Sequence, residues 1–215
     1  SLAPFVSLNL GDHVEDSLEA VLEHRRRLTD AFDIPPAWLR QVHGISVVEA
    51  DPSHTAEADG SWTSTPGIAC TSMTADCLPA LFCNRAGTRV AAAHAGWRGL
   101  AAGVLEAAVE SLDAEPADVL VWLGPAIGPQ AFEVGPEVRE AFVQQLPITA
   151  QAFVPSTRPG KFMADIYQLA RLRLAARGIT AVYGGGFCTV NDPRFFSYRR
   201  SPRTGRFASL IWLER

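Results

Sequence analysis

The chain lacks the paired residues that mark several common metal and redox centres. Its four cysteines form no Cys-x-x-Cys pair, and its five histidines form no His-x-His pair. A trinuclear copper cluster is fed by many histidines, typically as such pairs, so a multicopper centre is excluded. The zinc-deaminase pattern, His-x-Glu with Pro-Cys-x-x-Cys, is also missing. We expect most of the cysteines, which lie in apolar runs, to be reduced and buried, as is typical of a cytoplasmic protein.

Long apolar runs and an excess of positive charge are missing as well. No apolar run approaches the length of about 18 residues that a membrane helix needs, and no secretory signal is visible. The formal net charge is −4, which argues against general nucleic-acid binding. We therefore expect a cytoplasmic protein that binds a small molecule and contacts neither nucleic acid nor membrane. We expect it to be a monomer or a weak homodimer.

Basic charge is carried almost wholly by arginine, because Lys161 is the only lysine among 19 basic residues. Arginine suits phosphate and carboxylate recognition better than lysine does, although a composition bias of the genome gives the same pattern.

The apolar pattern predicts one domain of mixed helices and strands over residues 1–215. Hydrophobic residues make up 47% of the chain, enough for a substantial core. Predicted helices cover residues 15–32, 97–112 and 165–177, and another starts at Gly135. Predicted strands cover residues 38–50, 68–73, 78–83, 88–94, 118–123, 195–199 and 206–212, the last two joined as a hairpin. Strict βαβ alternation is absent, so we predict an α+β fold, a mixed β-sheet sandwich with flanking helices.

The run AAAHAGWRG, residues 91–99, is the most informative segment of the chain. His94 falls where a predicted strand ends, and the glycines after it allow a tight turn into a helix. Unpaired backbone N–H groups at a helix start attract anions, and Arg98 adds a full positive charge. The segment predicts a base or metal ligand beside an anion-binding corner.

Two further motifs, QVHG at residues 41–44 and TADCLP at residues 74–79, supply possible partners for His94. Two imidazoles and a thiolate, here His43, Cys77 and His94, form a known zinc set that leaves one position open. The spacing alone does not force these residues together, so a core cysteine with two unrelated histidines remains an alternative. Asp76 is either an orienting partner of one of the histidines or a turn residue.

These motifs, together with GPAIGPQAFEVG and FFSYRR-x-x-x-TGR, resemble the YfiH family, also called the laccase-domain or polyphenol-oxidase family. They occur in the family's order over nearly the whole chain. The family begins with a strand that carries an arginine and a Gly-Gly-Val-Ser turn. The chain starts at Ser1 within what looks like the end of that turn, so the resemblance implies that an N-terminal strand is missing. A fold similar to the cytotoxic necrotising factor catalytic domain is also implied.

The resemblance implies a zinc site of His43, Cys77 and His94, with copper as the other possible metal. It implies a purine nucleoside phosphorylase that cleaves adenosine, inosine and methylthioadenosine with phosphate and also deaminates adenosine. Cys77, His94 and Asp76 are then the candidate catalytic residues. The candidate substrate-binding residues are Asn9 in the SLNLG motif, Arg98 and Arg199; we rank Asn9 above His13, and we expect His24 to lie on a solvated helix face.

Other activities remain open for the same residues. Cys77 and His94 form a possible nucleophile–base pair for hydrolysis of an amide, such as one in a cell-wall precursor. His43, Cys77 and His94 also match a blue-copper trio, with Met73 as a possible axial ligand, which predicts at most weak polyphenol oxidation. A metal-dependent binding protein without catalysis is the non-enzymatic alternative.

Overall fold

The computed structural model describes residues 1–214, and its centre is a six-stranded mixed sheet. The strand order is β13-β9-β7-β8-β5-β3, with antiparallel pairing among β9, β7, β8 and β5 and parallel pairing at both edges. The strands are β3 (Val47–Glu49), β5 (Gly60–Thr63), β7 (Leu78–Asn84), β8 (Val90–Ala95), β9 (Val119–Leu123) and β13 (Ala181–Gly184).

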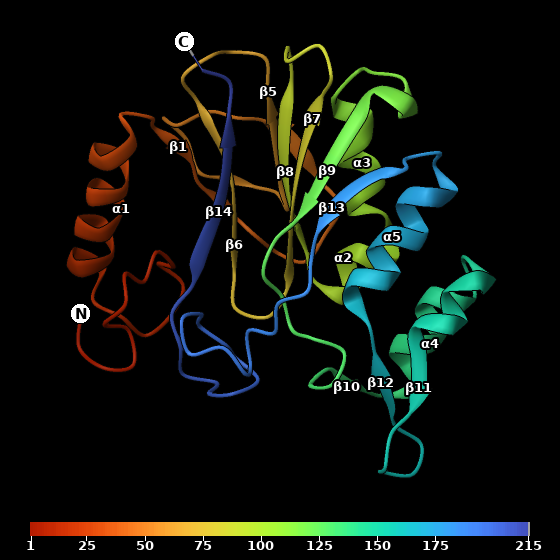
Figure 1. Cartoon of the computed structure of the whole chain (residues 1–215). Coiled ribbons are helices and arrows are strands. Elements are labelled where there is room, and N and C mark those ends of the chain that lie inside the picture. The colour runs from red at the N-terminus through yellow and green to blue at the C-terminus, as the bar shows by residue number, and fades with distance from the viewer. Residues whose placement is uncertain (215) are drawn as a thin grey trace.

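A second sheet has the order β1-β6-β14 and lies beside the first (Figure 1). It is formed by β1 (Pro36–Ala37), β6 (Ala69–Thr74) and β14 (Phe207–Trp212), and β14 runs antiparallel to β6. Two smaller units complete the strands: the pair β2 (Leu39–Arg40) and β4 (Ala56–Glu57), and the sheet of β10 (Glu133–Val134), β12 (Phe162–Ala164) and β11 (Phe153–Pro155).

Helices cover the face of the large sheet that points away from the second sheet (Figure 1). Strand β8 shows why, since Ala91, Ala93 and Ala95 belong to the core shared with the helices, whereas Val90 and Ala92 belong to the core shared with the second sheet. The helices on this side are α2 (Trp97–Ala102), α3 (Val104–Ser111), α4 (Pro136–Val143) and α5 (Ile166–Ala176), with 3₁₀ turns at Pro116–Asp118 and Pro147–Ala152. Helix α1 (Leu18–Phe32) lies on the opposite side of the molecule, beside the second sheet (Figure 1).

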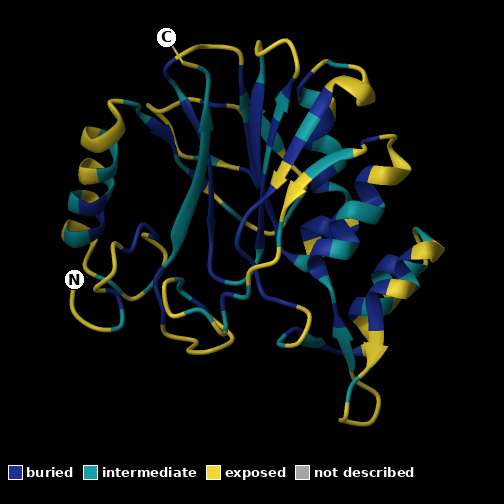
Figure 2. Cartoon of the chain, in the orientation of Figure 1, coloured by how far each residue is buried: buried dark blue, intermediate teal, exposed yellow. Residues whose placement is uncertain are grey.

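Burial follows this layering, with the central strands dark and the outer helix faces exposed (Figure 2). The predicted α+β class with mixed sheets and several helices is confirmed. Within residues 1–214, no helix is long and apolar enough to cross a membrane.

Three sequence predictions of local structure were wrong. The helix predicted at 97–112 is broken by Gly103, which has a φ of 113°. The strand predicted at 38–50 is interrupted by a loop between β2 and β3. Residues 195–199 form no strand, and β14 pairs with the distant β6 instead of closing a hairpin. Tertiary pairing overrode the local pattern in the last case.

The break at Gly103 gives a stability prediction. A left-handed conformation costs a residue with a Cβ about 1–2 kcal/mol, and more for a β-branched side chain. Gly103→Val is therefore expected to lower the free energy of unfolding by about 2 kcal/mol, and Gly103→Asn, which tolerates this conformation, by less. Urea unfolding measures both; equal stability of Gly103→Val and the parent chain would contradict the argument.

Candidate metal centre and pocket

Three separate segments bring His43, Cys77 and His94 together. His43 lies in the loop between β2 and β3, Cys77 directly precedes β7, and His94 lies near the end of β8. The β7–β8 register pairs Pro79 with His94, which places the Cys77 turn beside that histidine. One ligand atom from each residue lies within 4.8 Å of the others, and the two imidazole centroids are 4.7 Å apart. The predicted convergence of these three residues is therefore present.

Asp59, directly before β5, holds two of the three residues in place. Its carboxylate is fully buried and accepts a hydrogen bond of 2.8 Å from Nδ1 of His94. It also accepts hydrogen bonds from the backbone N–H groups of Val42, His43 and Gly44, at 3.1, 2.9 and 2.6 Å. Since Nδ1–H of His94 donates to Asp59, Nε2 is the ring nitrogen left to coordinate a metal ion.

The loop that carries His43 is fixed at both ends of the motif. Gln41 exchanges two hydrogen bonds of 2.8 Å with the backbone of Met73, the neighbour of Thr74 at the end of β6. His43 itself has a φ of 63°, an uncommon conformation for a residue with a side chain. Such a conformation persists where its surroundings over-determine it, and here three consecutive N–H groups point at Asp59.

Gly96 serves a different purpose from the one predicted. Its φ is −63°, so the turn does not require a left-handed residue. A Cβ at this position would lie 2.5 Å from Cδ2 of His43 and 3.2 Å from Sγ of Cys77. The glycine is needed because the side chains of His43 and Cys77, two of the candidate metal ligands, pass directly over the backbone.

The ionisation of the pair Cys77–His94 favours thiolate and imidazolium. Burial opposes the Cys77 thiolate, but the charge of His94 and hydrogen bonds from His43 and His94 lower its pKa to about 6. Burial also opposes the His94 cation, yet the Cys77 charge and the hydrogen bond to Asp59 raise its pKa to about 9. For Asp59, burial is outweighed by the donors His94, Gly44 and Val42, so its pKa lies below the ordinary value.

The donor set fits a zinc ion. A thiolate and two imidazoles are borderline to soft ligands that suit zinc or copper, and a Cys–His₂ set leaves room for a fourth ligand. Met73, the candidate axial ligand for copper, lines the same pocket, but its sulfur accepts from Nη2 of Arg25 at 3.8 Å. Within residues 1–214, His43, Cys77 and His94 form the one group of this kind, and it has ligands for a single ion.

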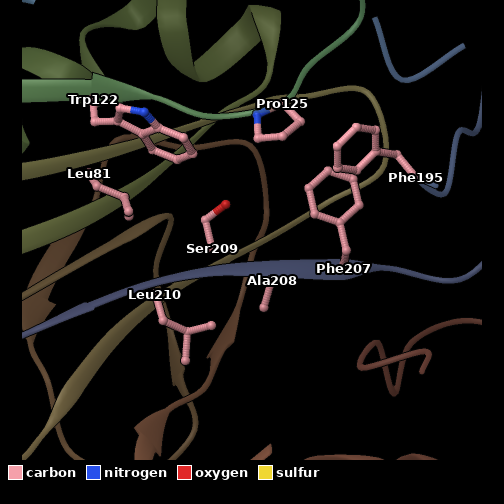
Figure 3. Close-up of a pocket in the computed structure, with 8 residues that line it drawn as sticks. All are labelled: Leu81, Trp122, Pro125, Phe195, Phe207, Ala208, Ser209 and Leu210. Atoms are coloured by element: carbon pink, nitrogen blue, oxygen red, sulfur yellow. The ribbon is translucent and has the colours of Figure 1, made fainter. Parts of the chain in front are cut away.

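The three side chains open into a pocket of about 410 Å³. Its polar walls include Arg98, Arg199, Arg206 and His13, and its apolar walls include Ile127, Phe132, Ile166 and Trp97. A second hollow of about 490 Å³ lies between β14 and β9, lined by Trp122, Phe195, Phe207 and neighbours (Figure 3). Its lining contains no titratable side chain, so the chemistry belongs to the first pocket.

The predicted arginines line the pocket in different ways. Arg98 is exposed, with its guanidinium carbon 4.4 Å from the ring centroid of Trp97. Arg199 lines the pocket, but its guanidinium donates to the backbone carbonyls of Ala131 and Glu133 at 3.0 and 3.2 Å.

Asp76 lines the pocket and, of the two roles predicted for it, has that of a turn residue, with a φ of 95°, and not that of an orienting partner of a histidine. Its carboxylate accepts from Oγ1 of Thr189 at 2.6 Å and from the backbone N–H of Arg199 at 2.6 Å. Asp76 therefore anchors the segment that carries Arg199, while Asp59 orients His94. Sequence reasoning missed Asp59, because an Asp-Gly pair before a strand is also typical of a plain turn.

Two predictions for the N-terminal residues were wrong. Asn9 is completely buried and does not line the pocket; its side chain bonds to Gly11, Asp16 and the backbone N–H of Arg206. His13, ranked below Asn9, does line the pocket. His24 is buried rather than solvated, with Nδ1 2.8 Å from the carbonyl of Asn9.

The fold and the three ligands define an α+β protein with a candidate metal centre in a pocket large enough for a small molecule. The family model described as multi-copper polyphenol oxidoreductase laccase matches residues 1–214. The chain belongs to this family. It is also similar to purine nucleoside phosphorylase YfiH over 99% of its length, so the predicted family resemblance is confirmed.

Relatives and solved structures agree with this assignment. The chain is 68% identical over 215 residues to a purine nucleoside phosphorylase of Pseudomonas aeruginosa, covering 100% of this chain and 89% of that protein. It is 55% identical over 218 residues to purine nucleoside phosphorylase YfiH of Escherichia coli, covering 99% and 89%. A Neisseria meningitidis protein of family DUF152 matches with a TM-score of 0.97 at 50% identity, covering 100% of this chain and 90% of that one. YlmD from Geobacillus stearothermophilus matches with a TM-score of 0.93 at 31% identity, covering 100% and 88%.

The role of Asp59 predicts a loss of metal affinity in Asp59→Asn. An amide has one acceptor oxygen in place of two and brings N–H groups against the donors of the loop. Partners of this kind are worth about 10- to 100-fold in metal affinity, so zinc competition with a chelating dye should show a loss of that size. Asp76→Asn, which touches neither histidine ligand, is the matched control. Equal zinc affinity in the two variants, with both folded by circular dichroism, would refute the role given to Asp59.

The lowered pKa of Cys77 predicts the pH dependence of its alkylation in metal-free protein. The thiolate is the reacting form, so the rate with iodoacetamide should rise with pH through a midpoint of about 6. His94→Gln removes the imidazolium and should move the midpoint to higher pH. Cys83, whose pKa is raised by burial, is the internal comparison. Mass spectrometry of the labelled peptides distinguishes the sites, and a Cys77 midpoint at the Cys83 value would contradict the prediction.

Proposed function

We propose that this protein is a zinc-dependent purine nucleoside phosphorylase that also deaminates adenosine. The observation that carries the proposal is the shared pocket, in which His43, Cys77 and His94 lie together with arginines and an apolar wall. The relatives with 68% and 55% identity, named purine nucleoside phosphorylases, support the same substrate class. Adenosine, inosine and methylthioadenosine are the proposed nucleosides.

Phosphorolysis joins a phosphate oxygen to C1′ of the ribose and breaks the bond from C1′ to the purine nitrogen. The purine leaves with the bonding electron pair and takes up a proton. Zinc held by His43, Cys77 and His94 supplies, when bound, a Lewis acid with an open position. In deamination of adenosine, the oxygen of water replaces the amino group, which leaves as ammonia.

The chain's own residues bind and orient the reactants. Arg98 is the proposed clamp for the anionic phosphate at the exposed edge of the pocket. Phe132 and Ile127 offer an apolar surface for the purine base. Asp76 keeps Arg199 at the wall through the Arg199 backbone N–H, while Asn9 supports the pocket from behind by fixing the backbone of Arg206.

One observation favours a second candidate, a cysteine hydrolase of an amide bond. The Cys77 thiol has a pKa of about 6 beside His94, and such a pair is the usual form of an activated nucleophile with its base. This candidate requires no metal. Weak copper-dependent polyphenol oxidation is the remaining alternative, since the ligand set also suits copper.

The test incubates zinc-loaded protein with adenosine, with and without phosphate, and separates adenine, inosine and hypoxanthine by chromatography. We expect phosphate-dependent release of adenine, which falls to background in Cys77→Ala and in metal-free protein. Cys83→Ala removes a thiol outside the pocket and is the matched control.

Full activity without metal would overturn the zinc-dependent proposal. Absence of any nucleoside conversion would overturn the phosphorylase, and metal-free hydrolysis of an amide that stops on alkylation of Cys77 would establish the hydrolase.

A further inference from the structure

Arg206 is a half-buried cation that faces the pocket without an acidic partner. It directly precedes β14, and its Nη1 donates to the carbonyls of Thr204 and Gly205 at 3.1 and 3.0 Å. Within residues 1–214, no carboxylate forms an ion pair with Arg206, and its Nε and Nη2 have no protein acceptor. Burial lowers the pKa of Arg206, partly offset by the negative charge of Cys77 and Asp76. A cation partly removed from water without a counter-charge is costly to that extent, and an anionic ligand would compensate the cost.

His13 lies beside this arginine on the same wall. Gly11 separates them: a Cβ there would lie 2.8 Å from Cγ of Arg206 and 3.4 Å from Cε1 of His13. Asp12 is the nearby acid, but it pairs with Arg25 at 3.3 Å and lies 3.6 Å from Nδ1 of His13. Burial and the charge of Arg206 lower the pKa of His13, so Arg206, and not His13, carries the positive charge of this wall, and His13 offers a neutral ring.

The local backbone is built to hold the two side chains there. Oδ1 of Asn9 accepts from the backbone N–H groups of Gly11 and Arg206, at 3.0 and 2.8 Å. One buried amide thus fixes both the turn that leads to His13 and the start of β14. The same bonds explain why Asn9 is buried although it belongs to a motif beside the pocket.

We propose that Arg206 and His13 form a binding subsite for a phosphate group. The inference rests on the proposed function and refines it: the exposed Arg98 attracts the phosphate at the edge of the pocket, while Arg206 and His13 hold it at their wall. A guanidinium with Nε and Nη2 available presents a planar fork that matches two phosphate oxygens. Of the other pocket arginines, Arg199 donates to backbone carbonyls, and Arg98 is exposed on Trp97. Arg206 is the pocket arginine that is half-buried and whose guanidinium has Nε and Nη2 free of protein acceptors within residues 1–214.

The test compares Arg206→Gln and His13→Gln with Arg203→Gln, each zinc-loaded and checked for metal content. Glutamine keeps Cβ and Cγ, which pack on Gly11, and leaves the backbone bond to Asn9 in place. Arg203 is an exposed arginine that pairs with Glu15 outside this pocket, so it controls for lost charge. Binding of inorganic phosphate, adenosine 5′-monophosphate and adenosine is measured by calorimetry, and the His13 ring signals are followed by NMR.

We expect Arg206→Gln to weaken phosphate binding about tenfold or more, the value of a lost charge-assisted hydrogen bond. Zinc content and adenosine affinity should stay within about twofold in every variant. Phosphate should shift the His13 signals in the parent chain and in Arg203→Gln, but not in Arg206→Gln. In turnover, KM for phosphate should rise while KM for adenosine does not.

The outcomes separate this inference from the proposed function. Phosphorolysis with an unchanged phosphate KM in Arg206→Gln leaves the phosphorylase standing and overturns the subsite. Absence of phosphorolysis, with phosphate binding that depends on Arg206, overturns the phosphorylase and keeps the subsite. If only the binding of free phosphate depends on Arg206, the subsite belongs to the co-substrate. The same dependence for the monophosphate as well assigns it to phosphate esters too, and unaltered binding of both ligands refutes it.

Discussion

The buried carboxylate of Asp59 is the interaction on which the site depends. A charge removed from water needs several donors, and Asp59 receives four: Nδ1 of His94 and three consecutive N–H groups of the loop 42–44. This one group therefore ties the end of β8 to a loop that no regular pairing holds. It fixes the ring orientation of one ligand and the left-handed backbone of another, His43. Because the donors come from both, displacement of either segment leaves the carboxylate undercompensated.

The pocket is lined by more positive side chains than the negative net charge of the whole chain would suggest. The whole sequence carries a net charge of −4, yet Arg98, Arg199 and Arg206 lie together around the ligand set. Within residues 1–214, their carboxylate neighbour, Asp76, accepts hydrogen bonds from Thr189 and the backbone of Arg199 and forms no ion pair with the three arginines. The result is a cavity that combines a thiolate–imidazole cluster, an apolar wall and surplus positive charge. That combination matches a substrate pair in which one partner is an aromatic base and the other an oxyanion.

Structural features that depend on neighbouring residues were predicted from the sequence, whereas features that depend on contacts between distant residues were missed. Apolar periodicity located β6, β7, β8, β9 and α5 to within a few residues, since each has a continuous buried stripe. Motif resemblance located His43, Cys77 and His94, although spacing alone could not bring them together. Asp59 and the pairing of β14 with β6 were missed, and Asn9 was expected to touch substrate, because each depends on partners far away in the chain. The sequence around a short polar residue before a strand does not indicate from which distant N–H groups it will accept hydrogen bonds.

The ligand set also limits how the family's description applies to this chain. Reduction of dioxygen to water needs several electrons delivered in sequence, which multicopper enzymes accomplish by storing them on several ions. Within residues 1–214, His43, Cys77 and His94 provide ligands for one ion, and one ion exchanges one electron at a time. Substrate oxidation coupled to water formation therefore has no electron store here. Group transfer has no such requirement, because one bond forms as another breaks with no net oxidation or reduction, and a positive wall with one Lewis acid suffices. The architecture thus favours a reaction that moves a glycosyl or amino group over one that moves electrons.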